Sequence, residues 1–197
     1  ILSIIPDGEP HVFGDCIYLF GSHDKEGGDK YCQEGNYMGW SAPLDHPTEW
    51  TSHGIIYEPS QDSEFFGHAF YEAASIRKIN GNYYFIYSSE NSNELCYATS
   101  QNYNEPYHFG GTIISNGDVG YHRRSGGNRT NQTANDHGSL ACIKGQWYIF
   151  HHRQTHSGTF SRQACAEPVR IAEDGSIAQV ECTSMGFHRG ALETKES

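Results

Sequence analysis

The chain has 197 residues, enough for one domain with a sizeable core, and a formal net charge of −11. This charge would repel phosphate backbones and argues against a nucleic-acid partner, while the absence of an apolar run near roughly 20 residues argues against a membrane span. Aromatic residues make up 13% of the chain and there are 22 glycines. This composition predicts an all-β fold of short strands and tight turns.

The first predicted unit covers roughly residues 6–58 and consists of four short antiparallel strands. Its strands are expected at 11–13, 16–20, 37–41 and 54–57. The turn Gly14-Asp15 separates the first two runs. A polar connector, 59–67, leads from this unit to the next.

The second unit, roughly residues 70–116, contains the clearest local signal, a hairpin with Asn80-Gly81 between two β-prone runs. Its strands are expected at 70–79, 83–88, 94–100 and 111–115. Glu72 lies near the start of the first strand among mostly apolar neighbours. Burial there would disfavour the ionised carboxylate and would suit a general acid. The alternative is a solvated strand residue.

The third unit, roughly residues 135–184, follows a long connector rich in Gly and Asn. Loops of that length are usually functional or disordered. The strands of this unit are expected at 139–143, 146–150, 162–166 and 176–180. Residues 188–197 are predicted to form a frayed polar tail.

Three aromatic runs centred on Tyr18, Tyr84 and Tyr148 recur at nearly equal spacing, one in each unit. Four-stranded units in tandem are typical of the blades of a β-propeller, which usually has four to eight of them. Three blades leave open faces and unpaired edges. We therefore expect completion by a homo-oligomer, most simply a two-fold dimer. The other option is a cut-down version of a longer propeller.

The six cysteines include no CxxC pair, so no zinc site built on them is expected, and we predict mostly reduced thiols. No signal peptide is recognisable, but the chain starts at Ile1 without Met. The sequence therefore leaves the compartment open between the cytoplasm and secretion.

Each unit begins with polar residues where its innermost strand would approach the propeller axis: Asp7 and Glu9, then Glu72, then the run Asp136–Ser139. Equivalent positions of successive blades converge, so we expect these side chains to meet in one axial pocket. Inverting glycoside hydrolysis needs such a pair of carboxyl groups, an acid and a base roughly 6.5–9.5 Å apart. The alternative is that these residues cap exposed strands.

Three groups of ordered motifs carry a resemblance to a known family. They are Pro6–Phe13 with Tyr18–Asp24, Tyr71–Ile79 with Gly81–Tyr84, and Asp136–Ser139 with Tyr148–Arg153 and Ser161–Gln163. These stretches resemble blades of glycoside hydrolase family 43, whose members are five-bladed propellers. The resemblance implies an inverting acid/base hydrolase of xylose- or arabinose-containing oligosaccharides, of the β-xylosidase or α-L-arabinofuranosidase type, as in xylan degradation.

The resemblance also implies roles for single residues. Glu72 matches the general acid, and Glu9, directly before Pro10, stands where the family has its aspartate base, with Asp7 as a rival. Arg162 matches an arginine that contacts the sugar, and His137 matches a histidine near an axial metal, often calcium bound through water. No cofactor is implied to be required. From the residues themselves, His23 and Phe66 are candidates for lining the sugar pocket.

The sequence departs from the family in one respect. Two blades that the family has between the first and second units are missing here, together with a third carboxylate that tunes the acid. The resemblance therefore implies an internally shortened relative whose activity is weak, altered or absent unless another chain supplies the missing walls. The alternative function is a catalytically inactive relative that binds carbohydrate. Metal-dependent hydrolysis through some of the 12 histidines ranks last.

Overall fold

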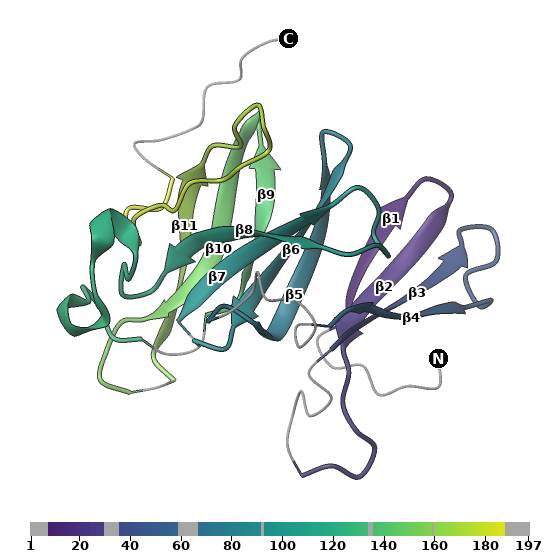
Figure 1. Ribbon diagram of the computed structural model, residues 1–197, viewed down its shortest axis with the longest axis horizontal. Helices are drawn as coiled ribbons and strands as arrows, with labels where there is room; N and C mark the ends of the chain where they lie inside the picture. The colour runs from purple at the N-terminus through teal and green to yellow at the C-terminus, as the bar shows by residue number, and fades with distance from the viewer. Residues whose placement is uncertain are drawn as a thin grey trace.

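The computed structural model describes residues 8–29, 36–58, 67–91, 93–133, 136–158 and 160–187. Within these ranges it is an all-β protein with three antiparallel sheets (Figure 1). The helical elements described are two short 3-10 turns, η3 (Tyr121–Arg123) and η4 (Gly126–Asn128). No helix in the described part of the chain is long and apolar enough to span a membrane.

Sheets A and B confirm the first two predicted units, with four strands each in chain order. Sheet A contains β1 (Glu9–Phe13), β2 (Cys16–Ser22), β3 (Tyr37–Pro43) and β4 (Thr51–Tyr57). Sheet B contains β5 (Phe70–Ile79), β6 (Asn82–Ser89), β7 (Glu94–Ser100) and β8 (His108–Ser115). Asn80 and Gly81 join β5 to β6 with φ angles of 50° and 89°. Both lie in the left-handed region that a type I′ hairpin turn requires.

Sheet C has three strands: β9 (Gly138–Ile143), β10 (Gln146–Gln154) and β11 (Arg162–Val169). The predicted fourth strand at 176–180 is wrong. Ile177 and Val180 form only isolated bridges, and Val180 bridges to Ile114 of β8. The Ile177 amide donates to the Tyr97 hydroxyl at 2.9 Å. The segment therefore satisfies its polar groups on sheet B instead of extending sheet C.

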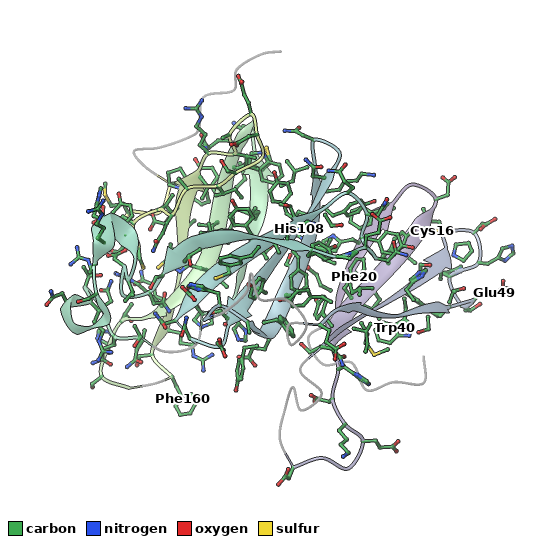
Figure 2. All side chains as sticks on the ribbon, in the orientation of Figure 1. Cys16, Phe20, Trp40, Glu49, His108 and Phe160 are labelled. Atoms are coloured by element: carbon green, nitrogen blue, oxygen red, sulfur yellow. The ribbon has the colours of Figure 1, made fainter. Side chains whose placement is uncertain are left out.

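Sheet B lies between the other two sheets and is covered on both faces (Figure 1). Its alternating side chains explain this arrangement, because neighbours along a strand point to opposite faces. Phe85 of β6 joins a cluster with Phe20 of sheet A, which lies where the two sheets meet (Figure 2). Ile86 joins a second cluster with Leu140 and Ile149 of sheet C. A strand buried on both faces accounts for the unbroken apolar run in β6.

Candidate active site

The first strands of the three sheets meet at two residues of β5, Ser75 and Arg77. The Ser75 hydroxyl donates to Glu9 Oε1 of β1 at 3.0 Å and lies 2.7 Å from the Ser139 hydroxyl of β9. Arg77 Nε donates to the carbonyl of Leu140 at 3.0 Å. Residues from the starts of all three units are therefore brought together, as expected for blades that share an axis.

Arg77 also makes the principal charge contact of this junction. Its Nη2 donates to Glu9 Oε1 at 3.0 Å, and its Nη1 lies 2.7 Å from His11 Nε2. The same His11 nitrogen lies 3.0 Å from Glu9 Oε2. Because one ring nitrogen cannot accept and donate at once, neutral His11 accepts from Arg77, whereas protonated His11 donates to Glu9.

The Glu9 carboxylate is held in its ionised form. Burial raises the pKa of Glu9, but the hydrogen bond from His11 and the charge and hydrogen bonds of Arg77 lower it by more, so the pKa lies below its usual value. Glu9 thus carries a charge at neutral pH, and its Oε1 accepts hydrogen bonds from Ser75 and Arg77.

This lowered pKa predicts a loss of stability in acid. Above the ordinary Glu pKa of about 4.3, the contacts of ionised Glu9 contribute fully to the free energy of unfolding. They are lost as the pH falls through the lower folded-state pKa. At neutral pH, Glu9→Gln should reduce the free energy of unfolding by about 1.5–3 kcal/mol, the range for hydrogen bonds to a charged group. Urea unfolding from pH 7 downward should show this difference shrinking in acid; a difference independent of pH would contradict the assignment.

Glu72 lies at an irregular point of β5 that turns its side chain inward. The pairing of β5 with β6 shifts register on both sides of Glu72, and Ala73 has a φ of 53°, rare for a residue with a side chain. Glu72 Oε1 lies 2.8 Å from His137 Nε2, and the Glu72 side chain is only 14% exposed. Glu72 is therefore a mostly buried, partnered carboxyl group rather than a solvated strand residue.

His137 is positioned by the buried residue before it. Asp136 is fully buried and lies 3.6 Å from His151 Nδ1 of β10. With its amide nitrogen facing both acceptors, Asn116 donates to Asp136 Oδ2 at 3.2 Å and to the carbonyl of His152 at 3.1 Å. Burial raises the pKa of Asp136, and the contact with His151 acts against that change. These contacts fix the entry to β9 and hold His137 against Glu72.

The contacts of Glu9 and Glu72 given above involve none of the remaining predicted site residues. His23 follows β2 at the same end of sheet A as Glu9, and its Nδ1 lies 3.0 Å from Asn36 Oδ1. Arg162 is exposed at the first position of β11, two strands outward from β9. Asp7 and Phe66 lie outside the described residues.

A calcium ion beside Glu72 and His137 would need ligands other than the described side chains. Calcium takes six to eight oxygen ligands. Glu72 and His137 together offer one carboxylate and one imidazole, and these already contact each other. Around Glu72 the described side chains therefore do not fit a calcium site, and no catalytic step is assigned to calcium.

Sequence reasoning missed Ser75, Arg77 and His11 as site residues. One signal was available: Arg77 is a charged residue on the strand that carries Glu72, directly after the buried Ile76. Its partners lie 63 and 68 residues away, so no local pattern could name them. A cavity of about 440 Å³ elsewhere, between β4 and the loop at 104–107, contains none of the predicted site residues.

The chain is similar to known glycoside hydrolases in sequence. The model of the family described as "Glycosyl hydrolases family 43" matches residues 10–177. A curated xylosidase/arabinosidase of Thermoclostridium stercorarium is 28% identical over 310 aligned positions, which cover 92% of this chain and 65% of that protein. A xylosidase/arabinosidase of Bacteroides ovatus is 32% identical over 114 residues, covering 57% of this chain and 31% of that protein.

The chain is thus shorter than the curated relatives that it matches, and part of the difference is internal. The Thermoclostridium alignment has 310 positions, whereas this chain has 197 residues, so more than a hundred aligned positions have no residue here. This is the pattern expected if segments the size of two blades are missing within the chain.

Solved structures show the same fold. The GH43_1 enzyme of Xanthomonas citri superposes with a TM-score of 0.64 at 20% identity, covering 94% of this chain and 58% of that one. Its complex with xylose gives a TM-score of 0.64 at 22% identity, with 91% and 56% covered. An arabinoxylan arabinofuranohydrolase of Bacillus subtilis, in complex with cellotetraose, gives a TM-score of 0.66 at 18% identity, with 95% and 39% covered.

Proposed function

This chain belongs to glycosyl hydrolase family 43, and from that premise we propose that it hydrolyses xylose- or arabinose-containing oligosaccharides by an inverting acid/base mechanism. The observation that carries the proposal is the partly buried pair of Glu72 and His137, 2.8 Å apart, at the irregular start of β5. The curated relatives described as xylosidase/arabinosidase and the xylose complex of the Xanthomonas enzyme support the sugar class.

In this mechanism Glu72 is the acid and Glu9 is the base. Protonated Glu72 gives its proton to the leaving oxygen while the glycosidic carbon–oxygen bond breaks. A water molecule attacks the anomeric carbon from the opposite side, and its proton passes to the ionised Glu9 carboxylate. His137 holds the Glu72 carboxyl group in place through the 2.8 Å contact.

The relative position of the two carboxyl groups supports this assignment. Glu9 bonds to Ser75, three residues after Glu72 on the same strand. Three residues of a strand span about 10 Å, so Glu72 and the Ser75 that binds Glu9 lie at the same end of β5. The lowered pKa of Glu9 keeps the base ionised but also makes it a weaker proton acceptor.

The test is turnover of aryl β-xyloside and aryl α-L-arabinofuranoside, with the first-formed product followed by NMR. We expect hydrolysis of at least one substrate and inversion at the anomeric carbon. A retained configuration would contradict the mechanism, and no turnover of either substrate would contradict the activity.

A second candidate function is carbohydrate binding without turnover. The observation that favours it is the engagement of Glu9 by Arg77, which limits its freedom as a base, in a chain that lacks more than a hundred positions of its relative. Measurable binding of xylo-oligosaccharides by calorimetry, with no hydrolysis, would select this function over the first.

Association of two copies is part of the proposal, because sheet A exposes two apolar side chains on its outer side. Val12 and Ile55 lie on the side of sheet A away from sheet B and are 58% and 48% exposed. Light scattering should show a dimer, and Val12→Glu should shift it toward the monomer by placing a charge on this face. Gln101→Glu adds the same charge at an exposed site beside sheet B and should leave the dimer intact. A monodisperse wild-type monomer would refute the association.

A further inference from the structure

We propose that His68, Glu94 and Cys96 form a binding site for Zn²⁺ or a cation of similar ligand preference. The three residues offer one nitrogen, one oxygen and one sulfur ligand, and these atoms all lie within 4.8 Å of one another. Imidazole, carboxylate and thiolate are the ligands that Zn²⁺ takes in proteins, and three of them leave a fourth position for water. This site is separate from Glu72, Glu9 and the proposed hydrolysis.

The backbone places the three ligands without further rearrangement. Glu94 and Cys96 are two residues apart on β7, so their side chains lie on the same face of sheet B. His68 comes from the segment that leads into β5, and the hydroxyl of Tyr87 donates to its carbonyl at 2.7 Å. The ring of His68 stacks on Phe109 of β8 at 5.2 Å, which holds the imidazole over Glu94 and Cys96.

The distances are close to those of a coordinated ion. Bond lengths of about 2.0–2.1 Å to nitrogen and 2.3 Å to sulfur put the two atoms about 3.6 Å apart in a tetrahedral site. His68 Nδ1 and Cys96 Sγ are 3.9 Å apart, so they need to approach by only a few tenths of an ångström. His68 Nδ1 and Glu94 Oε1 are 2.6 Å apart and would separate to about 3.4 Å as the ion replaces the shared proton.

The surroundings of Glu94 resemble the outer shell of a metal site. Ser89 and Asn91 donate to Glu94 Oε1 at 2.7 and 2.9 Å, and Thr112 donates to Oε2 at 3.0 Å. Such hydrogen bonds orient a ligating carboxylate. A cavity of about 340 Å³ lined by His68, Glu94 and Thr112 gives access from solvent. Arg129 also lines this cavity, and its positive charge opposes a cation there.

Coordination would fix a segment next to the candidate active site. His68 lies four residues before Glu72, and the ion would join this segment to β7. The cysteine thiol would lose its proton to solvent on binding, and no other bond changes. The site uses a single cysteine with a carboxylate from the same strand and a histidine from a distant segment, which is why a search for paired cysteines could not predict it.

Cobalt substitution tests the site directly on the full chain. Co²⁺ added to metal-free protein should give the visible bands of tetrahedral cobalt and the near-ultraviolet charge-transfer band of a cobalt–thiolate bond. Cys96→Ser should abolish the charge-transfer band, and Cys142→Ser, at an exposed cysteine, should leave it unchanged. An unchanged band in Cys96→Ser, or octahedral cobalt in the wild type, would mean an adventitious ion only and would overturn the proposal.

A second variant distinguishes loss of a ligand from loss of the fold. This is needed because Cys96 is fully buried, so that replacing it can also lower stability. The His68 side chain is 36% exposed, so His68→Gln should fold. It should weaken Zn²⁺ binding in calorimetry by more than tenfold, since even loss of an outer-shell partner costs roughly 10–100-fold. Zn²⁺ should raise the Tm of the wild type and not that of His68→Gln. Equal affinity in both proteins would refute the role of His68.

Discussion

Glu72→Gln should lower kcat by roughly 10²–10⁴-fold, the usual contribution of a general acid. Glutamine keeps the shape of the side chain and its contact with His137, 2.8 Å away in the wild type, but it cannot give up a proton to the leaving oxygen. The loss should therefore be largest for substrates with a poor leaving group. Aryl glycosides with strongly acidic phenols need little protonation and should retain most of their rate.

Two further measurements separate this role from a structural one. The limb of the pH–rate profile that reports the acid should disappear in Glu72→Gln, because the titrating group is gone. Glu90→Gln, which removes the same charge at an exposed turn of the same sheet, should keep wild-type kinetics. Equal losses on good and poor leaving groups would show that Glu72 is not the acid.

Arg77→Met should reduce the free energy of unfolding by about 3 kcal/mol, the lower end of the range for breaking a buried ion pair. The lower end applies because the Arg77 and Glu9 side chains are 24% and 27% exposed. The variant leaves the Glu9 carboxylate without its positive partner and removes the bond to the Leu140 carbonyl. kcat should fall as well, since a displacement of about 1 Å in a catalytic group can cost roughly a hundredfold.

Lys78→Met is the matched control, with the same change of charge and side chain one residue along β5. Lys78 is exposed, and its ammonium lies 4.9 Å from the ring centre of Tyr83. This contact contributes only about 0.5–1 kcal/mol at an exposed site. Urea unfolding should therefore distinguish the two variants clearly. Similar losses in both would indicate that Arg77 acts only as an average surface charge.

Much of the fold could be predicted because its signals are local. The Asn80-Gly81 turn, the apolar run of β6 and the recurring aromatic runs can each be read directly from the sequence, and the first two sheets match the prediction. The fourth strand of the last unit could not be predicted correctly. Its β-like residues satisfy their hydrogen bonds on Tyr97 and Ile113 of another sheet, a choice that depends on tertiary packing.

The candidate site also has a part that the sequence predicts and a part that only the structure shows. The repeat identifies three candidates, because they lie at the starts of the units: Glu72, Glu9 and His137. Their catalytic roles remain proposals. The geometry adds what no pattern contains, namely that Arg77 pairs with Glu9 and that a left-handed Ala73 follows Glu72. Both depend on contacts between strands that are distant in sequence.

The junction at Arg77 has a consequence for the order in which the chain folds. Glu9 lies 68 residues before Arg77, and Leu140 lies 63 residues after it, so two long loops must close before the junction exists. The hairpin of β5 and β6 closes over a two-residue turn, and short-range contacts form faster than long-range ones. We therefore expect the local hairpins to form before this junction, so that the two carboxyl groups of the candidate active site acquire their geometry late in folding.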